Sequence, residues 1–206
     1  MPGRPYHHKT DKRQEYIPIN EILDELKMWI SENPHLVKDL QYITLSGTGE
    51  PTLNIKAGQL IAEIKKLTSV PVAVISNASL FCDPQVRKEL LGADLIVPSL
   101  DAATDKVFLR VDRPMLPLKT EDIINGIAAL KKEYRGKLWL EVMLVKGLND
   151  DLRHIRRLKE AIDRINPDKI QLNSPVRTTA ECNVSSVLKP KLNKIKQILG
   201  DKCEVI

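Results

Sequence analysis

Short β-rich segments alternate with amphipathic segments of helical periodicity along this sequence, and the alternation limits the folds open to it more than any other feature. Ile22, Leu26 and Trp29, for example, recur at helical spacing within 20–31. The run VPVAVIS at 70–76 is typical of a strand buried on both faces of a parallel sheet. The predicted strands are 41–46, 70–76, 94–99, 138–145, 169–173 and 203–205.

Residues that start and stop helices support this reading. Asp83 is a suitable N-cap, Pro84 follows at the first helical position, and Gly92 comes just past the expected end. The last helix has Pro190 near its start and Gly200 past its end.

Strands that alternate with helices imply right-handed βαβ connections, and therefore a singly wound barrel or an open doubly wound sheet. A complete eight-unit barrel takes ~250 residues, whereas this chain has 206 residues. The sequence thus predicts a single α/β domain over 1–206, and it is compatible with a partial barrel. In both architectures ligands bind at the carboxyl ends of the strands.

Composition excludes several classes of protein. With 42% hydrophobic and 29% charged residues the chain is neither disordered nor a membrane protein. It has no apolar run of the ~18 residues that a membrane span needs and no signal peptide, so a cytoplasmic location is expected. The net charge of +5 favours anionic partners such as RNA or a phosphorylated ligand.

Polar residues follow one predicted strand after another. Because parallel strands end at one edge of a sheet, these side chains would line a cleft suited to a polar, nucleoside-like ligand. Such residues also make turns and cap helices, and Asp150 is as suitable for an N-cap as for a ligand contact. No single residue among them indicates a ligand site, but their occurrence together after successive strands does. The candidates are Ser46, Gly47, Thr48, Gly49, Glu50, Ser76, Asn77, Ser99, Asp101, Glu141, Met143, Asn149, Asp150 and Asn173.

Other motifs can be set aside. The run Gly47–Thr52 has neither the third glycine of a dinucleotide fingerprint nor the Lys of a Walker loop. The four histidines lack metal-ligand spacing and are expected mostly at the surface. Cys82, Cys182 and Cys203 are far apart and are interpreted as structural thiols, although Cys82 precedes a helix start that would lower its pKa.

Taken together, four segments resemble one known family. SGTGEPTLN, SNASLF, PSLDA followed by RVDRP, and EVMLVKGLND are similar to the core of radical S-adenosylmethionine enzymes. Within that superfamily the chain looks most like the branch of wyosine-type transfer RNA modification enzymes and uncharacterised iron–sulfur oxidoreductases. The resemblance covers about 6–178 and implies a partial (βα)6 barrel.

The resemblance also implies roles for individual residues. Ser46 to Glu50 match the motif whose backbone takes the amino group of S-adenosylmethionine, and Ser76 and Asn77 match positions near its carboxylate and ribose. Ser99 and Asp101 match the ribose-contacting strand. Weaker matches are Val145, Gly147 and Asp150 in the loop that packs on adenine, and Asn173 on the last strand of the pocket.

One departure from the family is large. Members hold a [4Fe–4S] cluster on a Cys-x-x-x-Cys-x-x-Cys loop after their first strand, and this sequence has no such motif. PGRPYHHKTDKR at its start resembles the stretch after the third cysteine, so 1–15 are interpreted as a remnant of the cluster loop that can be disordered. We expect no metal site in this chain, weak binding of S-adenosylmethionine, and a sequence shortened from a longer protein.

A missing first strand has a structural consequence. It would leave the strand at 41–46 as an unpaired edge, for which a homodimer or a strand supplied from elsewhere would compensate.

Three functions therefore stay open. Intact members of the family cleave S-adenosylmethionine at the cluster to give a 5′-deoxyadenosyl radical, a reaction that this chain should not perform by itself. The second hypothesis is a non-catalytic partial barrel that binds a nucleoside or RNA. The third is an unrelated βα-barrel lyase or isomerase with Glu50, Asp101 or Glu141 as general base.

Overall fold

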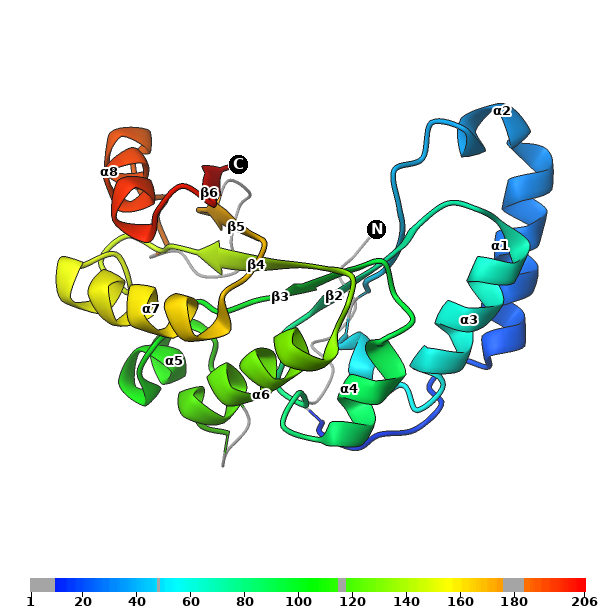
Figure 1. Cartoon of the computed structure of the whole chain (residues 1–206), viewed down its shortest axis with the longest axis horizontal. Helices are drawn as coiled ribbons and strands as arrows, with labels where there is room; N and C mark the ends of the chain where they lie inside the picture. Colours follow the sequence, from blue (N-terminus) through cyan, green and yellow to red (C-terminus); the bar gives the residue numbers. More distant parts are fainter. Residues whose placement is uncertain (1–9, 48, 115–117, 176–183) are drawn as a thin grey trace.

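The computed structural model describes residues 10–47, 49–114, 118–175 and 184–206. The described residues form a sheet of six strands, which runs through the middle of the molecule with helices around it (Figure 1). The strands are β1 (Ile43–Leu45), β2 (Val72–Ser76), β3 (Leu95–Pro98), β4 (Lys137–Met143), β5 (Lys169–Asn173) and β6 (Cys203–Val205). The helices are α1 (Ile19–Glu32), α2 (Pro34–Val37), the 3-10 helix η1 (Pro51–Leu53), α3 (Ala57–Leu67), α4 (Pro84–Leu90), α5 (Asp105–Val111), α6 (Thr120–Glu133), α7 (Leu152–Ile165) and α8 (Lys189–Leu199).

The strands form one sheet in the order β1-β2-β3-β4-β5-β6, and every neighbouring pair is parallel. Sequential order in a parallel sheet is the arrangement of a singly wound barrel. The prediction of a partial βα barrel is therefore confirmed. Most predicted strands are one to three residues too long, as with 41–46 against Ile43–Leu45, because loop residues around the paired segment share its composition.

The two faces of the sheet are covered differently. Leu138, Leu140 and Val142 of β4 are fully buried in the main core with the helices. Trp139 and the two other alternate residues of β4, on the opposite face, are only partly buried. A second, small apolar cluster of Ala73, Leu95 and Val97 with Tyr42 and Trp139 forms the floor of that face. Beyond this apolar floor, Glu141 and Met143 continue the same face of β4 toward its carboxyl end and are partly buried.

Two aspartates connect the amino ends of neighbouring strands in the same way. Asp94, just before β3, accepts a hydrogen bond from the backbone N–H of Val72 in β2 at 2.8 Å and an ion pair from Lys65 of α3 at 2.6 Å. Asp168, just before β5, does the same with the N–H of Leu138 in β4 at 2.8 Å and with Lys131 of α6 at 2.6 Å. Each carboxylate therefore joins two neighbouring strands and the helix that precedes the first of them in the chain.

Helix boundaries follow the expected chemistry with one exception. Asp83 accepts a hydrogen bond from the N–H of Gln85 at the start of α4, and Gly200 ends α8 with φ +104°. The N-cap of α7 is Asp151, not the suggested Asp150, and it accepts from the N–H of His154 at 3.0 Å. Asp150 instead accepts from the N–H of Gly147 and pairs with Lys191 of α8.

Three features bear on the wider expectations. Within the described residues, no helix is long and apolar enough to cross a membrane. Residues 10–15 of the predicted remnant are described, and the N–H of Gln14 donates to the carbonyl of Leu53 at 3.0 Å. Strand β1 pairs with β2 at one edge of the described sheet, and dimerisation through its other edge stays a prediction.

We predict that Asp168→Ala destabilises the fold by about 1–3 kcal/mol at pH 7, because the N–H of Leu138 loses its hydrogen-bond acceptor. The backbone contact and Lys131 lower the pKa of Asp168 in the folded chain. Its stabilising contribution is therefore present above the pKa of the unfolded state and is lost as the pH falls through the folded pKa. Urea unfolding at pH 7 and pH 3 measures both effects.

The matched control is Asp163→Ala. Asp163 also pairs with a lysine, Lys159, but holds no backbone N–H in a strand. This exposed pair should contribute about 0.5 kcal/mol or less. Equal losses in the two variants would contradict the role given to Asp168.

Candidate functional site

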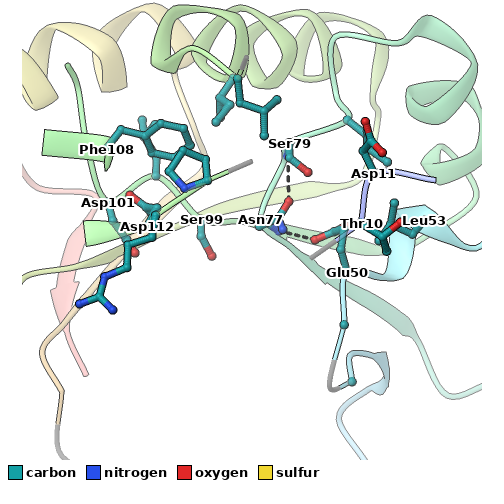
Figure 2. Close-up of a pocket in the computed structure, with 18 of the residues that line it drawn as sticks. Thr10, Asp11, Glu50, Leu53, Asn77, Ser79, Ser99, Asp101, Phe108 and Asp112 are labelled. Atoms are coloured by element: carbon teal, nitrogen blue, oxygen red, sulfur yellow. Dashed lines mark hydrogen bonds between the residues drawn. The ribbon is translucent and has the colours of Figure 1, made fainter. Parts of the chain in front are cut away.

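A cavity of about 980 Å³ opens at the carboxyl ends of β1, β2 and β3. Figure 2 shows Thr10, Asp11 and Glu50 on one side of it, and Asp101, Phe108 and Asp112 on the opposite side. Polar groups come from the loops after the three strands, and Leu80, Leu118 and Ile123 add apolar surface. The predicted convergence of strand ends has thus produced a cavity in the size range of small-molecule sites.

Glu50 joins the loops after β1 and β2. Its carboxylate accepts hydrogen bonds from the Oγ of Ser76 at 2.7 Å and from the N–H of Asn77, also at 2.7 Å. It accepts two more from the N–H and hydroxyl of Thr52, at 3.1 and 2.6 Å. Four donors for one carboxylate fix the relative position of these loops, so Glu50 is a positioning residue for the cavity wall.

The loop after β2 is held in a tight and strained turn. Ala78 has φ +57°, a left-handed conformation that is costly for a residue with a Cβ. Two local hydrogen bonds support it, from the N–H of Ala78 to Ser76 Oγ at 3.0 Å and from the N–H of Ser79 to Asn77 Oδ1 at 2.9 Å. The turn places Asn77 and Ser79 on the cavity wall (Figure 2).

Gly47 and Gly49 leave room where the cavity begins. Both line it, and a Cβ built on either residue would meet no atom within 4 Å. A side chain at these positions would therefore occupy cavity space without disturbing the fold.

Two carboxyl groups with raised pKa values, Asp101 and Asp112, lie close to each other on the same side of the cavity (Figure 2). Burial raises the pKa of Asp101 to about 8, helped by the charges of Asp112 and Glu141, although the carboxyl also accepts from the N–H of Met143 at 2.8 Å. Burial also raises the pKa of Asp112 to about 6. At neutral pH Asp101 is therefore mostly protonated and can donate a hydrogen bond.

Asp112 and Phe108 were missed by the sequence reasoning as site residues. Both lie in or next to the short helix α5, which the periodicity analysis did not resolve. Arg113, which follows, also lines the cavity and has φ +49°. The motif RVDRP contains Asp112 and Arg113 and could have indicated these two residues, because it formed part of the family resemblance.

Some predicted site residues lie away from this cavity. Ser46 is exposed beside it, Ser76 is buried beneath it, and Thr48 falls outside the described residues. Val145, Gly147 and Asn173 do not line it either. Glu141 links two strand ends on the concave face, accepting from Ser99 Oγ at 3.3 Å and from Asn173 Nδ2 at 2.8 Å.

Asn149 fixes the loop that contains Val145 and Gly147. It is fully buried, accepts from the N–H of Val145 at 2.7 Å, and donates to the carbonyls of Asp101 and Met143 at 2.8 Å each. Asn149 therefore ties the ends of β3 and β4 together directly behind the cavity residue Asp101.

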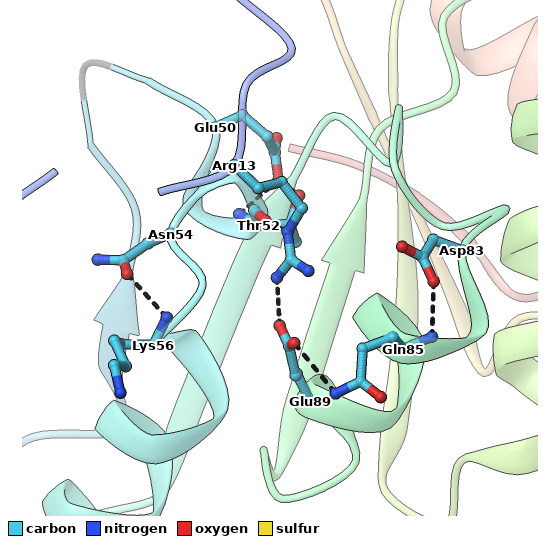
Figure 3. Close-up of polar contacts among 8 residues, drawn as sticks. All are labelled: Arg13, Glu50, Thr52, Asn54, Lys56, Asp83, Gln85 and Glu89. Carbon is cyan, nitrogen blue, oxygen red and sulfur yellow. Dashed lines mark hydrogen bonds and ion pairs between the residues drawn. The ribbon is translucent and has the colours of Figure 1, made fainter. Parts of the chain in front are cut away.

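The segment 10–17 is clamped against the same site. Arg13 pairs with Glu89 of α4 and donates to the carbonyl of Thr52 at 3.0 Å (Figure 3). This contact holds Thr10, Asp11, Tyr16 and Ile17 at the cavity wall.

One sequence expectation about a titratable residue is wrong. The pKa of Cys82 is raised, not lowered, because burial and the charge of Asp122 outweigh nearby Arg87. The histidines were expected mostly at the surface: His35 is exposed, whereas His154 is buried, and burial lowers its pKa. His7, His8 and Cys182 fall outside the described residues. Within the described part, no three His, Cys, Asp or Glu side chains could hold a metal ion together.

The comparisons with known proteins agree with this geometry. Residues 4–166 match the model of the Radical SAM superfamily, so the chain belongs to that superfamily. It is 35% identical over 170 residues to the UPF0026 protein slr1464 of Synechocystis, covering 82% of this chain and 61% of that protein. It is 27% identical over 155 residues to the dual-specificity RNA methyltransferase RlmN of Helicobacter hepaticus, covering 71% and 41% of the two chains.

The fold has close structural counterparts. The crystal structure of a radical SAM methyltransferase from Sphaerobacter thermophilus superposes with a TM-score of 0.72 at 18% identity, over 92% of this chain and 57% of that one. Compared with the curated relatives that it matches in sequence, the chain spans less than two thirds of their length.

We predict that Asp101→Asn stabilises the fold more at pH 8 than at pH 5. The folded pKa is raised, so the unmodified chain loses stability as the pH rises from the unfolded pKa to about 8, and the amide removes this loss. The difference between the two pH values should be about 2 kcal/mol or more in urea unfolding. Asparagine keeps an oxygen that can accept from Met143.

Asp105→Asn is the control. Thr120 lowers the pKa of Asp105, so no gain in stability with rising pH is expected from its removal. An Asp101→Asn effect that is the same at pH 5 and pH 8 would show that Asp101 titrates normally.

Proposed function

We propose that this domain binds the adenosyl part of S-adenosylmethionine in the cavity at the ends of β1 to β3. The observation that supports this proposal best is the cavity of about 980 Å³, which is lined by backbone and side-chain groups from the ends of three strands. Cleavage of S-adenosylmethionine is the general reaction of the superfamily to which the chain belongs.

The residues of the cavity suit the parts of this ligand. Gly47 and Gly49 allow close approach of the backbone to its amino acid end. Asn77, Ser99 and protonated Asp101 can bond the ribose hydroxyls, while Phe108 and Leu80 offer apolar surface to the base. Glu50 acts indirectly, by fixing the loops that carry Gly49 and Asn77.

The family's [4Fe–4S] cluster supplies the electron for cleavage when it is bound, but the two cysteines in the described part of this chain do not fit it. Burial raises the pKa of Cys203 to about 11, and its side chain is fully inaccessible. The exposed Cys82 donates its thiol hydrogen bond to the carbonyl of Asp122 at 2.9 Å. Cluster ligation needs accessible thiolates. We infer that turnover requires ligands which these 206 residues do not contain.

A lyase or isomerase with Glu50 as its base is less well supported. All four donors on the Glu50 carboxylate come from the protein itself, which opposes its use as a proton acceptor. A binding domain without catalysis would use the same cavity, so calorimetric titration with S-adenosylhomocysteine tests this alternative as well.

We propose RNA as the substrate class. The relative from Helicobacter hepaticus carries the name of an RNA methyltransferase, and the net charge of +5 favours a polyanion.

We predict that Gly47→Val lowers the affinity for S-adenosylhomocysteine at least tenfold in calorimetric titration. The valine side chain would fill the space that the ligand needs. Because a Cβ at residue 47 meets no protein atom within 4 Å, the thermal unfolding midpoint should stay unchanged. Unchanged affinity in a folded variant would place the ligand elsewhere.

Anaerobic reconstitution with iron and sulfide provides a separate test of the cluster assignment. We expect far less than one [4Fe–4S] cluster per chain in Mössbauer spectra, because Cys82 and Cys203 form no local ligand set. A cubane signal near one cluster per chain would contradict this expectation and restore a catalytic role for the chain alone.

A further inference from the structure

Three arginines on the outer face of α7 stand out among the basic side chains. Arg153, Arg156 and Arg157 are all exposed, and in the described part of the chain none has a side-chain hydrogen bond or an ion pair. Two other basic residues of α7 are paired with acids: Arg164 with Glu121 at 2.8 Å and Lys159 with Asp163 at 2.5 Å. The three arginines thus gather positive charge that no ion pair neutralises within the described structure.

These arginines lie at the functional edge of the sheet. Helix α7 starts directly after the loop that leaves the carboxyl end of β4, and the three arginines occupy its first two turns. Asn149, in that loop, is bonded to the carbonyl of Asp101 in the cavity. Figure 1 shows α7 beside the sheet, next to α6. Lys146, also exposed, lies in the same loop.

The local charge pattern favours an anionic partner. Asp151 caps the helix N-terminus, and the first turn that follows contains no acidic residue beside Arg153. The buried residues of α7, among them Ile155 and Leu158, already pack in the core, so the outward arginines are not needed to bury the helix. Arg153 is separated from Arg156 and Arg157 by about one turn, which is ~5.4 Å along the axis. A row of charges at that spacing suits a phosphate backbone better than a single anion.

We propose that Arg153, Arg156 and Arg157, with Lys146, form a docking surface for the phosphate backbone of RNA. This inference rests on the proposed substrate class and names the surface that holds it. Contacts from arginine to phosphates fix the register of a nucleic acid without reading its sequence. The bound strand would present one nucleotide toward the sheet edge where the cavity opens.

Other partners fit this surface less well. A membrane surface would need an apolar anchor next to the charges, and Leu152 is the one large exposed apolar side chain in these turns. Unspecific stacking of single-stranded bases would need exposed aromatic rings, and the described part of α7 has none. Of the three partners compared, folded RNA bound through its phosphates therefore fits this surface best.

The test compares two variants of the full chain with equal loss of charge. Arg153→Gln, Arg156→Gln and Arg157→Gln are combined in one variant. The control combines Lys132→Gln, Arg135→Gln and Lys137→Gln, three exposed basic residues at the amino end of β4 that also lack ion pairs within the described structure. Binding of an in vitro transcribed transfer RNA is measured by fluorescence anisotropy between 50 and 200 mM salt.

We expect the α7 variant to bind RNA at least tenfold more weakly and to lower the slope of log affinity against log salt by about 2. The control variant should stay within about twofold of the unmodified chain. Equal losses in the two variants would show that only net charge matters and would overturn the proposal. So would absence of RNA binding by the unmodified chain, or binding of polyglutamate as tight as that of RNA.

Affinity for S-adenosylhomocysteine, measured on the same variants, separates this inference from the proposed function. It should be the same in the α7 variant as in the unmodified chain. If no variant binds S-adenosylhomocysteine while RNA binding still depends on α7, the cavity assignment fails and the docking surface stands.

Discussion

Parallel pairing of six sequential strands is the constraint on which the rest of this structure depends. It brings every carboxyl end to one edge, so loops far apart in sequence build one cavity. The pairing is secured at the opposite edge, where Asp94 and Asp168 each bond the neighbouring strand and a lysine of the helix that precedes that strand. Stability is thus concentrated at the amino ends of the strands, which leaves the carboxyl ends for loops chosen by function.

At the carboxyl edge two residues are held in arrangements that cost free energy: one in its backbone conformation and one in the burial of its carboxyl group. Ala78 adopts a left-handed conformation, and the carboxyl of Asp101 is buried with its pKa raised to about 8. Both features persist because surrounding contacts fix them: Glu50 and Ser76 hold the turn, and Met143 and Asn149 hold Asp101. Strain and buried charge of this kind are typical of binding sites.

Charge is divided between the inside and the outside of this edge. The cavity contains the acidic pair of Asp101 and Asp112, whereas the adjoining turns of α7 carry unpaired arginines. A small polar ligand and an anionic macromolecule would therefore meet different electrostatic surfaces on one side of the sheet. The proposed S-adenosylmethionine site and the proposed RNA-docking surface each rest on one side of this division.

Local sequence determined the periodic elements, the polar strand ends and the family, because burial of one helix face and both strand faces requires a readable apolar pattern. It also determined the absence of a cluster motif from these 206 residues. Only the tertiary structure decided which polar residues meet. It brought Glu50 to Ser76 and Asn77, added Asp112 from a short helix without a clear period, and left Val145, Gly147 and Asn173 outside the cavity. The directions of side chains at loop ends, and hence burial and pKa, depend on contacts between distant segments, which no local pattern encodes.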